Sequence, residues 1–589
     1  MTQFASKQAS VRGVCRRWRL PEPVEVPPGL AVEPVVARVL AARGLVDPKT
    51  LEEFLAPSLL GLADPSLIPD LDRAAGRLHD AARAGESIVI YGDYDVDGVT
   101  ATAILFHMLR AVAPEAPLST YVPHRVEEGY GLNGAAIRSL AEGGARVIVS
   151  VDCGVTAVAE AQLARALGVD LIITDHHNPP SAMEDLPPAW AVVHPRRPDS
   201  TYPFGELCGA GVAYKLAWRI ATIASGSDRV RDDLRARLIN LLALAALGTI
   251  ADVVPLVGEN RILARFGLAR IKTSPLIGLR ALVRASNLDG EEIDSERAGF
   301  LLAPRLNACG RMSHAADAVE MFTTADEARA AQIAGDLNRL NSRRQATERR
   351  MVEQACAMAE AAGMTGPEQR AIVLAHPEWA PGVVGIAASR LVDRYGRPTI
   401  LMQAREDVCA GSGRSIDGFN LHAALSEVAD TLAGFGGHDM AAGVRVAPER
   451  LGEFSDRFME VAGSRLTAED LTPACRVDTD ALLGELSVAA ARQLASLAPF
   501  GRGNPSARIR LTGLRLAAAP ERFGRTGDHL SLRITDGARQ MRCVGWKWAA
   551  QAPEMSRGTG VELVVSPKLS SWNGTERVEP TLVDLRVIA

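Results

Sequence analysis

Short apolar runs alternate with longer Ala- and Leu-rich stretches from residue 87 onward. The apolar runs are rich in β-branched residues and lie at 87–93, 118–124, 146–152, 171–177 and 191–195. Most of the stretches between them, such as 99–112 and 155–167, have the composition of helices. Continuous apolar strands that alternate with helices are typical of a parallel sheet covered on both faces. The pattern therefore predicts an α/β lobe in this part of the chain.

A long helix pattern follows at 326–362. Apolar residues recur there at spacings of three and four, with no proline and with no glycine after residue 335. We expect this helix to connect two lobes. Its other faces carry the arginines Arg339, Arg343, Arg344, Arg349 and Arg350. Two interpretations of these side chains stay open, a solvated helix face and a basic wall beside a nucleic-acid channel.

The rest of the chain shows two further patterns. A second α/β pattern, dense in glycine, begins at 370–376, and from about residue 475 short strand-like runs with polar turns predict a small β-barrel. We therefore expect an α/β fold with two α/β lobes joined by a long helix, plus a C-terminal β-barrel. The expected segments are an N-terminal segment (1–50), a first lobe (51–325), the connecting helix (326–362), a second lobe (363–465) and the barrel (466–589).

Composition narrows the class of protein. The chain has 589 residues and a net charge of −5, so any nucleic-acid surface must be a local groove. Eight cysteines without a C-x-x-C pair favour reduced thiols and a cytoplasmic location. The N-terminus lacks the apolar core of a signal peptide. The most apolar stretch, 238–257, carries Asn240, Asp252 and Pro255, which favours a buried helix over a membrane span.

Acidic and imidazole side chains follow three of the predicted strands. They are Asp93, Asp95 and Asp97 after the first strand, Asp152 after the third, and Asp175, His176 and His177 after the fourth. The carboxyl ends of parallel strands meet at one edge of a sheet, where ligands bind. Carboxylates crowded there without cations would repel one another. Mixed Asp and His ligands suit Mn²⁺ or Zn²⁺, an oxygen-rich site also accepts Mg²⁺, and this many carboxylates favour two metal ions.

Each motif alone has a simpler interpretation. D-x-D-x-D-G resembles the start of a calcium loop, but the glutamate that such a loop needs is missing. Asp152 alone fits a helix N-cap, and the histidine pair alone fits a solvated loop. Asp252 lies between an apolar helix and a proline, where it fits either a metal ligand or a structural hydrogen bond. The occurrence of three motifs at the ends of predicted strands favours the metal site.

Several motifs resemble those of a known family. "GDYDVDG", "VDCG", "TDHH" and "GTIADVVPL" occur in this order and resemble the motifs of the DHH phosphoesterase superfamily. Further stretches narrow the resemblance: "YVPHRVEEGYGL" (121–132), "PRLNACGRMSHA" (304–315), "GSGRS" (411–415) and "GFGGHDMAAG" (434–443). With them, the chain resembles the RecJ family of bacterial single-strand-specific 5′→3′ exonucleases over roughly residues 45–589.

The resemblance implies roles for individual residues. It implies two divalent ions, Mn²⁺ or Mg²⁺, held by Asp95, Asp97, Asp152, His176 and Asp252, with Asp152 as the bridge. It implies that His177 contacts the scissile phosphate, that Asp93 ligates or orients, and that Arg311 offsets phosphate charge. The substrate phosphates would be held by Arg125, Arg311, Ser412, Arg414 and His438. The glycines of "GSGR" predict a loop whose backbone N–H groups cradle a phosphate, with an ordinary turn as the alternative.

The same resemblance implies a function and partners. The function is a single-stranded-DNA-specific 5′→3′ exonuclease that releases 5′-mononucleotides in DNA repair and recombination. The implied protein is a cytoplasmic monomer that binds single-stranded DNA, a single-strand-binding protein and recombination or mismatch-repair proteins, and that binds no membrane. Two other functions stay open: a small-substrate phosphodiesterase or pyrophosphatase of the same superfamily, which needs no barrel, and a non-catalytic scaffold, which needs no cluster of acids.

The C-terminal barrel resembles the oligonucleotide-binding fold. Its candidate stacking and charged residues are Trp546, Trp548, Trp572, Phe523, Arg522 and Arg525. Burial in the barrel core is equally open for each tryptophan. We expect the helix arginines Arg343, Arg344 and Arg350 to form a groove with Arg414 and the barrel. That groove would lead a single strand to the metal site and exclude a duplex.

Overall fold

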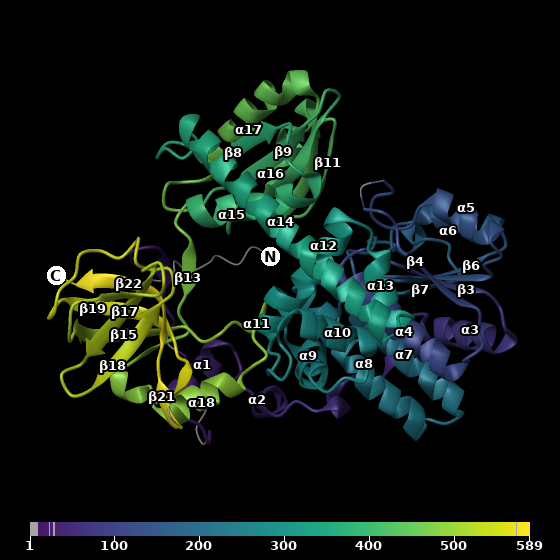
Figure 1. Ribbon diagram of the computed structural model, residues 1–589, viewed down its shortest axis with the longest axis horizontal. Helices are drawn as coiled ribbons and strands as arrows, with labels where there is room; N and C mark the ends of the chain where they lie inside the picture. Colours follow the sequence, from purple (N-terminus) through teal and green to yellow (C-terminus); the bar gives the residue numbers. More distant parts are fainter. Residues whose placement is uncertain (1–9, 23, 27–29, 126, 573, 589) are drawn as a thin grey trace. The chain divides into compact units, whose positions relative to one another are not determined.

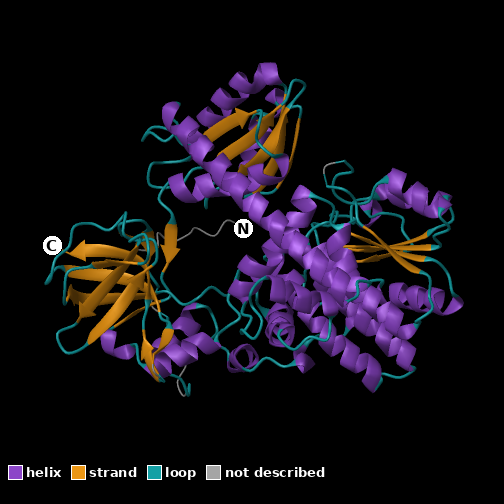
Figure 2. Ribbon diagram, in the orientation of Figure 1, coloured by secondary structure: helices purple, strands orange, loops and turns teal. Residues whose placement is uncertain are grey.

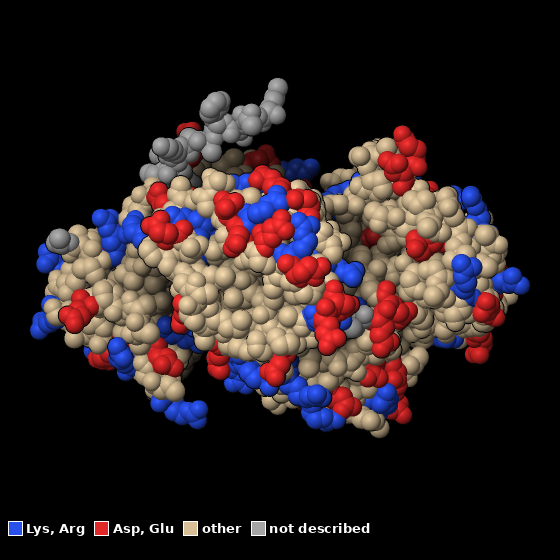
Figure 3. All heavy atoms as spheres, turned by 90° about the horizontal axis from the view of Figure 1, so that it is seen from above, with Lys and Arg blue, Asp and Glu red and all other residues tan. Residues whose placement is uncertain are grey.

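The computed structural model describes the chain except for residues 1–9, 23, 27–29, 126, 573 and 589. It contains two compact units. The sheet unit comprises Glu52–Arg344 together with Ala498–Pro505, and the barrel unit comprises Met1–Leu51, Gln345–Leu497 and Ser506–Ala589 (Figures 1 and 2). Acidic and basic side chains are interspersed over the face seen in Figure 3, in keeping with a net charge of −5.

The sheet unit is built on a parallel sheet, as predicted. The strand order is β4-β3-β5-β6-β7, and all pairs are parallel. The strands are β3 (Ile88–Gly92), β4 (Leu118–Tyr121), β5 (Val147–Val151), β6 (Asp170–Thr174) and β7 (Ala191–Val193). Gly92 pairs with Val151, and Val151 pairs with Thr174. Because these three strands end level with one another, the residues that follow them meet at one edge of the sheet.

Helices cover both faces of this sheet, and alternate strand residues point to each face. Ile88 and Ile90 join the core beneath α3 (Leu71–Ala84), α4 (Val96–Val112), α7 (Gly209–Ser225) and α8 (Asp232–Ala251). Val89 and Tyr91 pack on the other side, against α5 (Gly134–Glu142) and α6 (Val158–Ala166). Further helices of the unit include α9 (Gly258–Ile271), α10 (Ile277–Ala285), α11 (Ser295–Arg297), the π-helical turn η4 (Ala298–Leu302), α12 (Ala303–Met312) and α13 (Ala316–Thr323).

Helix α8 is the apolar stretch that resembled a membrane segment. By length and composition it could cross a membrane, but 61% of its apolar window is buried inside the protein. Leu241, Leu244 and Leu247 are fully buried in the core shared with α4 and α7. The expectation of a buried helix is therefore confirmed.

Helix α14 (Glu327–Ala361) is a single uninterrupted helix of 35 residues that runs from the sheet unit into the barrel unit. Arg343, Arg349 and Arg350 are exposed, as a solvated or basic face requires. The placement of Arg344 on that face was wrong. Its residue surface is only 8% exposed, and its guanidinium donates hydrogen bonds to Oδ1 of Asn341 one turn earlier.

The barrel unit contains a second α/β layer. Its sheet has the order β11-β12-β10-β9-β8 and is antiparallel except for the β8–β9 pair. The strands are β8 (Ile372–His376), β9 (Thr399–Ala404), β10 (Cys409–Arg414), β11 (Gly434–Gly437) and β12 (Ala441–Val446). The helices are α15 (Pro381–Tyr395), α16 (Leu421–Glu427) and α17 (Leu451–Arg465). Phe454 and Phe458 of α17 are buried in the core on one side of this sheet.

The predicted barrel is confirmed. Five strands close on themselves in the order β15-β19-β22-β18-β17, because β17 also pairs with β15. They are β15 (Ile509–Leu516), β17 (His529–Thr535), β18 (Gln540–Gly545), β19 (Gly560–Ser566) and β22 (Thr581–Ile588). The accessory elements are β14 (Thr479–Ala481), α18 (Val488–Ser496), β16 (Glu521–Phe523), β20 (Leu569–Trp572) and β21 (Thr575–Val578).

The N-terminal segment is attached to the barrel. Strands β1 (Ser10–Arg12) and β2 (Arg17–Arg19) form a three-stranded sheet with β13 (Ala474–Arg476). The fully buried carboxylate of Asp584, in β22, accepts hydrogen bonds from the backbone N–H groups of Cys15 and Arg16 and from Nε1 of Trp18. Helices α1 (Pro34–Ala42) and α2 (Pro48–Leu55) follow. Local periodicity in the first 50 residues contained no sign of this long-range pairing.

Candidate metal centre

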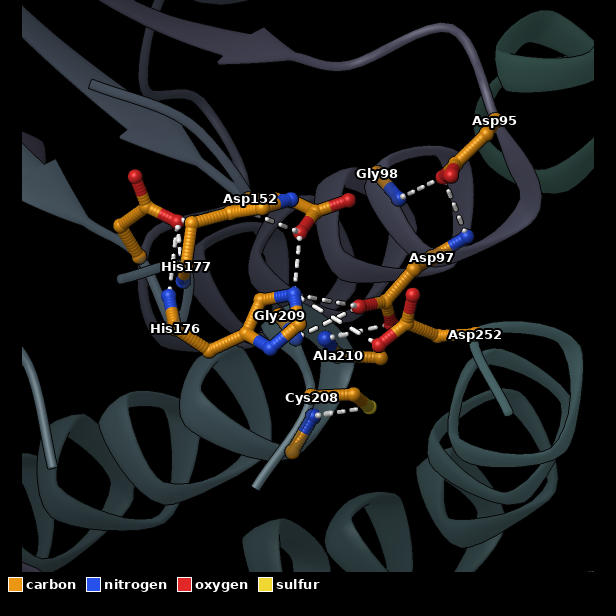
Figure 4. A network of polar contacts seen from close by, with 12 residues as sticks. Asp95, Asp97, Gly98, Asp152, His176, His177, Cys208, Gly209, Ala210 and Asp252 are labelled. Carbon is orange, nitrogen blue, oxygen red and sulfur yellow. Dashed lines mark hydrogen bonds and ion pairs between the residues drawn. The ribbon is translucent and has the colours of Figure 1, made fainter. Parts of the chain in front are cut away.

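The three motifs meet where β3, β5 and β6 end (Figure 4). Asp93, Asp152 and Asp175 each follow directly after one of these strands. Asp252 joins them from the C-cap of α8, from a segment far along the chain. The structure therefore brings together carboxylates and imidazoles that the sequence places up to 159 residues apart, from Asp93 to Asp252.

His176 lies at the centre of one group of ligands. Its Nε2 atom is 3.1 Å from Oδ1 of Asp152, 3.6 Å from Oδ2 of Asp252 and 3.8 Å from Oδ2 of Asp97. Asp93, Asp95 and Asp152 form an adjoining group, in which the candidate ligand atoms lie within 4.8 Å of one another. Asp152 belongs to both groups, which is the geometry that a bridging ligand of two ions requires.

Several buried oxygen and nitrogen atoms of this site make no hydrogen bond to the described residues, and a bound cation would supply a partner for them. Among the described residues, Oδ1 of Asp93, Oδ1 of Asp152 and Nε2 of His176 are buried and make no hydrogen bond. Burial together with neighbouring carboxylates raises the pKa of Asp93 to about 8 and raises that of Asp152 well above its usual value. Burial lowers the pKa of His176 to about 4, so its imidazole is neutral near pH 7 and offers a lone pair. Buried acceptors without donors are costly, and divalent cations would relieve this cost.

Backbone N–H groups orient two of the acids. Oδ1 of Asp95 accepts hydrogen bonds from the N–H groups of Asp97 and Gly98 and thereby caps α4. The carboxylate of Asp97 accepts from the N–H groups of Gly209 and Ala210, 2.6 and 2.8 Å away, at the amino end of α7. The positive end of a helix favours a carboxylate at this place.

Glycines permit close approach of α7 and α8 to these acids. A Cβ atom added to Gly209 would lie 2.6 Å from Cβ of Asp152, and one added to Gly248 would lie 2.6 Å from Oδ1 of Asp97. Any larger residue at either position would displace a candidate ligand. Our sequence interpretation missed both glycines, whose only signal was the motifs "CGAG" and "LGTIAD".

Asp152 has a strained backbone. Its φ of 64° is in the left-handed region, which is uncommon for residues other than glycine and costs roughly 1–3 kcal/mol. Its N–H donates to the carbonyl oxygen of Thr174, and its own carbonyl accepts from the hydroxyl of Tyr130, 3.0 Å away. The neighbouring strands thus hold the carboxylate in a position that a relaxed backbone would not give it.

The two adjacent histidines have different environments. The side chain of His177 is 41% exposed, whereas that of His176 is 11% exposed. Nδ1 of His177 lies 2.8 Å from Oδ1 of Asp175 and 3.0 Å from the hydroxyl of Tyr130. Burial alone would lower the pKa of His177, but the hydrogen bond and the charge of Asp175 raise it to about 9.

Asp175 and Tyr130 are orienting residues that our sequence interpretation did not assign. Asp175 is buried, and its carboxylate accepts hydrogen bonds from the N–H groups of Val155 and His176 as well as from His177. Burial alone would raise its pKa, but the interactions with His177 and with the N–H group of Val155 lower it to about 2. Asp175 therefore stays ionised and holds the ring of His177 beside the metal ligands.

Arg125 and Arg311 both lie beside the loop that carries Asp93 and Asp95. The guanidinium of Arg125 stacks 4.7 Å from the ring centre of Tyr94. Helix α12 carries Arg311 and approaches the same loop so closely that a Cβ on Gly310 would lie 2.6 Å from the carbonyl oxygen of Tyr94. Burial and Asp93 raise the pKa of Tyr94 to about 12, and the charges of both arginines oppose that rise.

Ser412, Arg414 and His438 lie in the barrel unit. The expected phosphate-cradling loop at 411–414 was wrong, because these residues belong to strand β10, which is paired with β9 and β12 on its two sides. Their backbone N–H groups are therefore used in the sheet. The side chain of Arg414 donates a hydrogen bond to Oγ of Ser412. Both side chains project toward the amino end of α15, since a Cβ on Gly385 would lie 2.7 Å from Nη2 of Arg414 and 3.2 Å from Oγ of Ser412.

His438 is exposed in the tight turn between β11 and β12. Its N–H donates to the carbonyl oxygen of Ala441, and the preceding Gly437 has a φ of 141°. The glycine-rich stretch around His438 therefore forms a tight turn.

The barrel tryptophans separate into core and surface. Trp548 is 4% exposed and belongs to the core, whereas Trp546 is 56% exposed. The ring of Trp546 packs edge-on against Phe523 and His529, and the guanidinium of Arg542 lies 5.4 Å from the centre of the Phe523 ring. Arg522 and Arg525 are exposed nearby in sequence. The side chain of Trp572 lies outside the described residues.

The parallel sheet with clustered aspartate and histidine side chains at its carboxyl edge is the arrangement expected of a DHH-type protein, and the family models agree. The DHH family N-terminal domain matches residues 87–249, the DHHA1 domain matches 360–464, and the RecJ OB domain matches 477–584.

Curated relatives narrow the class. The single-stranded-DNA-specific exonuclease RecJ of Bacillus subtilis is 37% identical over 578 residues, which is 97% of this chain and 71% of that protein. RecJ of Thermus thermophilus is 36% identical over 97% of this chain and 77% of that protein. The crystal structure of RecJ in complex with Mn²⁺ from Thermus thermophilus matches with a TM-score of 0.78 at 33% identity, covering 97% of this chain and 79% of that one. The chain belongs to the RecJ family.

Proposed function

We propose that this protein is a metal-dependent exonuclease specific for single-stranded DNA, which works in the 5′→3′ direction and releases 5′-mononucleotides. The observation that carries the proposal is the group around His176, where three carboxylates lie within 3.1–3.8 Å of Nε2. The names of the relatives support the substrate class.

The site would hold two divalent ions, Mn²⁺ or Mg²⁺. Its ligands would be Asp95, Asp97, Asp152, His176 and Asp252, with Asp152 bridging. Structures of RecJ from Thermus thermophilus in complex with Mn²⁺ and with Mg²⁺ support this choice of metals. Two such cations would activate water as the nucleophile at neutral pH and would offset charge on the leaving oxygen.

The protein's own groups would bind and orient the scissile phosphate. His177 carries a proton near neutral pH, so its exposed ring donates a hydrogen bond to a phosphate oxygen, while Asp175 and Tyr130 fix the ring. Arg311 and Arg125 contribute guanidinium groups, whose fork binds two phosphate oxygens at once. Asp93 either ligates or orients, since its Oδ1 is buried and makes no hydrogen bond to the described residues.

Contacts outside the metal centre would hold the rest of the strand. In the barrel unit, Ser412 and Arg414 with the amino end of α15, and His438 in its turn, are proposed to bind the DNA backbone. The exposed Trp546 and Phe523, with Arg542, offer stacking and positive charge of the kind that single strands use. This barrel distinguishes the chain from enzymes that need only a small substrate.

Family membership alone supports the cellular side of the proposal. This part of the proposal comprises a role in DNA repair and recombination, a cytoplasmic location and a monomeric state. It also comprises binding to a single-strand-binding protein and to recombination or mismatch-repair proteins.

The test uses one single-stranded oligonucleotide labelled at either end, with Mn²⁺ or with EDTA. With Mn²⁺, the 5′-labelled strand should release labelled mononucleotide at once, whereas the 3′-labelled strand should shorten progressively. Early release of label from the 3′ end would overturn the direction. Cleavage of a dinucleotide without degradation of the long strand would overturn the substrate class, and full activity in EDTA would overturn the metal dependence.

A further inference from the structure

A short segment before the barrel belongs structurally to the sheet unit. Residues Ala498–Pro505, "APFGRGNP", connect α18 to β15, which both lie in the barrel unit, but they pack with the sheet unit. Our sequence interpretation assigned this segment to the barrel and gave it no role. The contacts of this segment with the sheet unit indicate what it does there.

Several hydrogen bonds hold the segment in place. The N–H of Leu256 donates to the carbonyl oxygen of Arg502 over 2.7 Å. Oγ of Ser295 donates to the carbonyl oxygen of Phe500 over 2.6 Å. Gly501 and Asn504 exchange backbone hydrogen bonds, and the buried side chain of Asn504 donates to the carbonyl oxygen of Pro499. Arg502 therefore lies at the tip of a tight turn whose base is fixed.

Two glycines allow this turn to lie against the chain that follows Asp252. A Cβ on Gly501 would lie 2.8 Å from Cδ1 of Leu256. Gly503 has a φ of 75°, and its Cβ would lie 3.0 Å from Cβ of Pro255. The "GRG" sequence thus combines close backbone packing on both sides with a single long cationic side chain.

The segment to which the turn is hydrogen-bonded, at Leu256, leads directly to the metal centre. Leu256 lies four residues after Asp252, and Val253 between them has a left-handed φ of 59°. A β-branched residue rarely adopts this conformation, so the turn after Asp252 is strained and needs support. The main chain of Arg502 supplies part of that support.

The side chain of Arg502 is exposed. The carbonyl oxygen of Arg502 accepts the hydrogen bond from Leu256, four residues after Asp252, so the turn is fixed to the segment that leaves this ligand. Arg502 thus brings a positive charge to the side of the site that Asp252 occupies, whereas Arg125 and Arg311 lie at the loop of Asp93 and Asp95.

We infer that Arg502 binds a backbone phosphate of the DNA strand at the Asp252 side of the metal centre. The inference rests on the proposed function. An exposed guanidinium on an anchored turn can donate to two phosphate oxygens without ordering its own backbone, which lowers the entropic cost of binding. This contact would position the strand next to the phosphate that is cleaved.

The experiment compares Arg502→Gln, Arg502→Lys and Arg229→Gln with the unaltered full chain. Arg229 is a matched control, because its side chain is 83% exposed and it precedes the first residue of α8, about 30 Å along that helix from Asp252. The first readout is the anisotropy of a fluorescent 5′-phosphorylated single strand, titrated in EDTA at several salt concentrations. The second is kcat/KM for the same strand with Mn²⁺, and the third is calorimetric titration of Mn²⁺ without DNA.

The expected result is weaker DNA binding by Arg502→Gln, on the order of tenfold at low salt, with a log–log salt slope shallower by about 0.7. Arg502→Lys should retain the slope, because the charge remains, and Arg229→Gln should match the unaltered protein. Mn²⁺ affinity should be the same in all four proteins.

Three results would overturn the inference. These are an unchanged salt slope in Arg502→Gln, an equal loss in Arg229→Gln, and a loss of Mn²⁺ affinity that parallels the loss of DNA binding. The last would mean that the substitution disturbs the turn after Asp252, so that the loss of DNA binding does not report a lost phosphate contact. Binding in EDTA does not depend on turnover, so an unaltered protein that binds DNA without degrading it would refute the proposed function and still leave Arg502 tested.

Discussion

The Nε2 atom of His176 lies 3.1 Å from Oδ1 of Asp152, and neither atom makes a hydrogen bond within the described part of the chain. Burial keeps the imidazole neutral by lowering its pKa to about 4, so the pair is not an ordinary ion pair at neutral pH. Two unsatisfied electron pairs that face each other in a buried site are the arrangement that a metal ion completes. The first two predictions follow from this relationship.

Asp152→Asn should lower kcat by about a thousandfold or more, because it weakens a ligand that both ions would share. Asparagine tolerates the left-handed backbone at this position, so the fold should persist. In EDTA the melting temperature should stay the same or rise, since one of several mutually repelling acids is removed. Single-turnover rates and calorimetric melting measure both effects.

The control is Asp185→Asn, which removes an exposed carboxylate from the turn between β6 and β7. It should leave kcat and the melting temperature in EDTA unchanged. Retention of more than about a tenth of the activity by Asp152→Asn, which is under ~1.4 kcal/mol of barrier, would be too much for a bridging ligand.

The two histidines should respond differently to replacement by alanine. His176→Ala should weaken Mn²⁺ binding, because Nε2 faces three carboxylates of the centre. His177→Ala should lower kcat by about a hundredfold with nearly unchanged Mn²⁺ affinity, because its ring is exposed and held by Asp175 and Tyr130. Calorimetric Mn²⁺ titration and steady-state kinetics separate the two cases. The reverse pattern of metal affinities would exchange the two assignments.

Trp546→Ala should weaken binding of long single strands by about 1–3 kcal/mol, the usual contribution of a base stacked on an aromatic side chain. The ring is 56% exposed on the barrel surface, so its loss should not unfold the barrel. Very short oligonucleotides should be cleaved at the normal rate. Equal losses on short and long strands would mean that this surface is not a separate contact for the strand.

Deletion of the barrel would be a poorer test than this point substitution. Removing residues 475–589 would also remove Ala498–Pro505, which pack with the sheet unit, and most of β13, whose Cys475 is buried beside Trp18. The truncated chain would therefore lose contacts of its core together with the DNA-binding surface.

A buried ion pair in the sheet unit permits a prediction about stability. Nζ of Lys215 is fully buried and lies 2.5 Å from Oε2 of Glu259, whose Oε1 accepts a hydrogen bond from Tyr202. Lys215→Met should lower the free energy of unfolding by about 3–5 kcal/mol, because it leaves the glutamate buried without its partner. The double variant Lys215→Met/Glu259→Gln should recover much of this loss. Urea unfolding measures both, and a double variant no more stable than the single one would contradict the explanation.

Local sequence pattern was sufficient for the frame of the metal centre. Apolar runs predicted the strands, and parallel pairing requires that their carboxyl ends share an edge. Because Gly92, Val151 and Thr174 are in register, the residues after them had to meet. The shared edge is therefore a consequence of parallel pairing, which the local pattern predicts, whereas the placement of β3, β5 and β6 side by side belongs to the strand order of the sheet.

Tertiary structure alone decided which side chains complete that frame. "GSGR" has the composition of a loop, yet hydrogen bonding on both sides makes it strand β10, because sheet pairing with distant segments outweighs the low strand propensity of glycine. Arg344 has the pattern of an exposed residue, yet its packing buries it. The contacts of Gly209, Gly248 and Arg502 around the metal centre join segments that lie far apart in the chain. Local periodicity carries no information about such contacts, because they depend on how whole helices and strands pack.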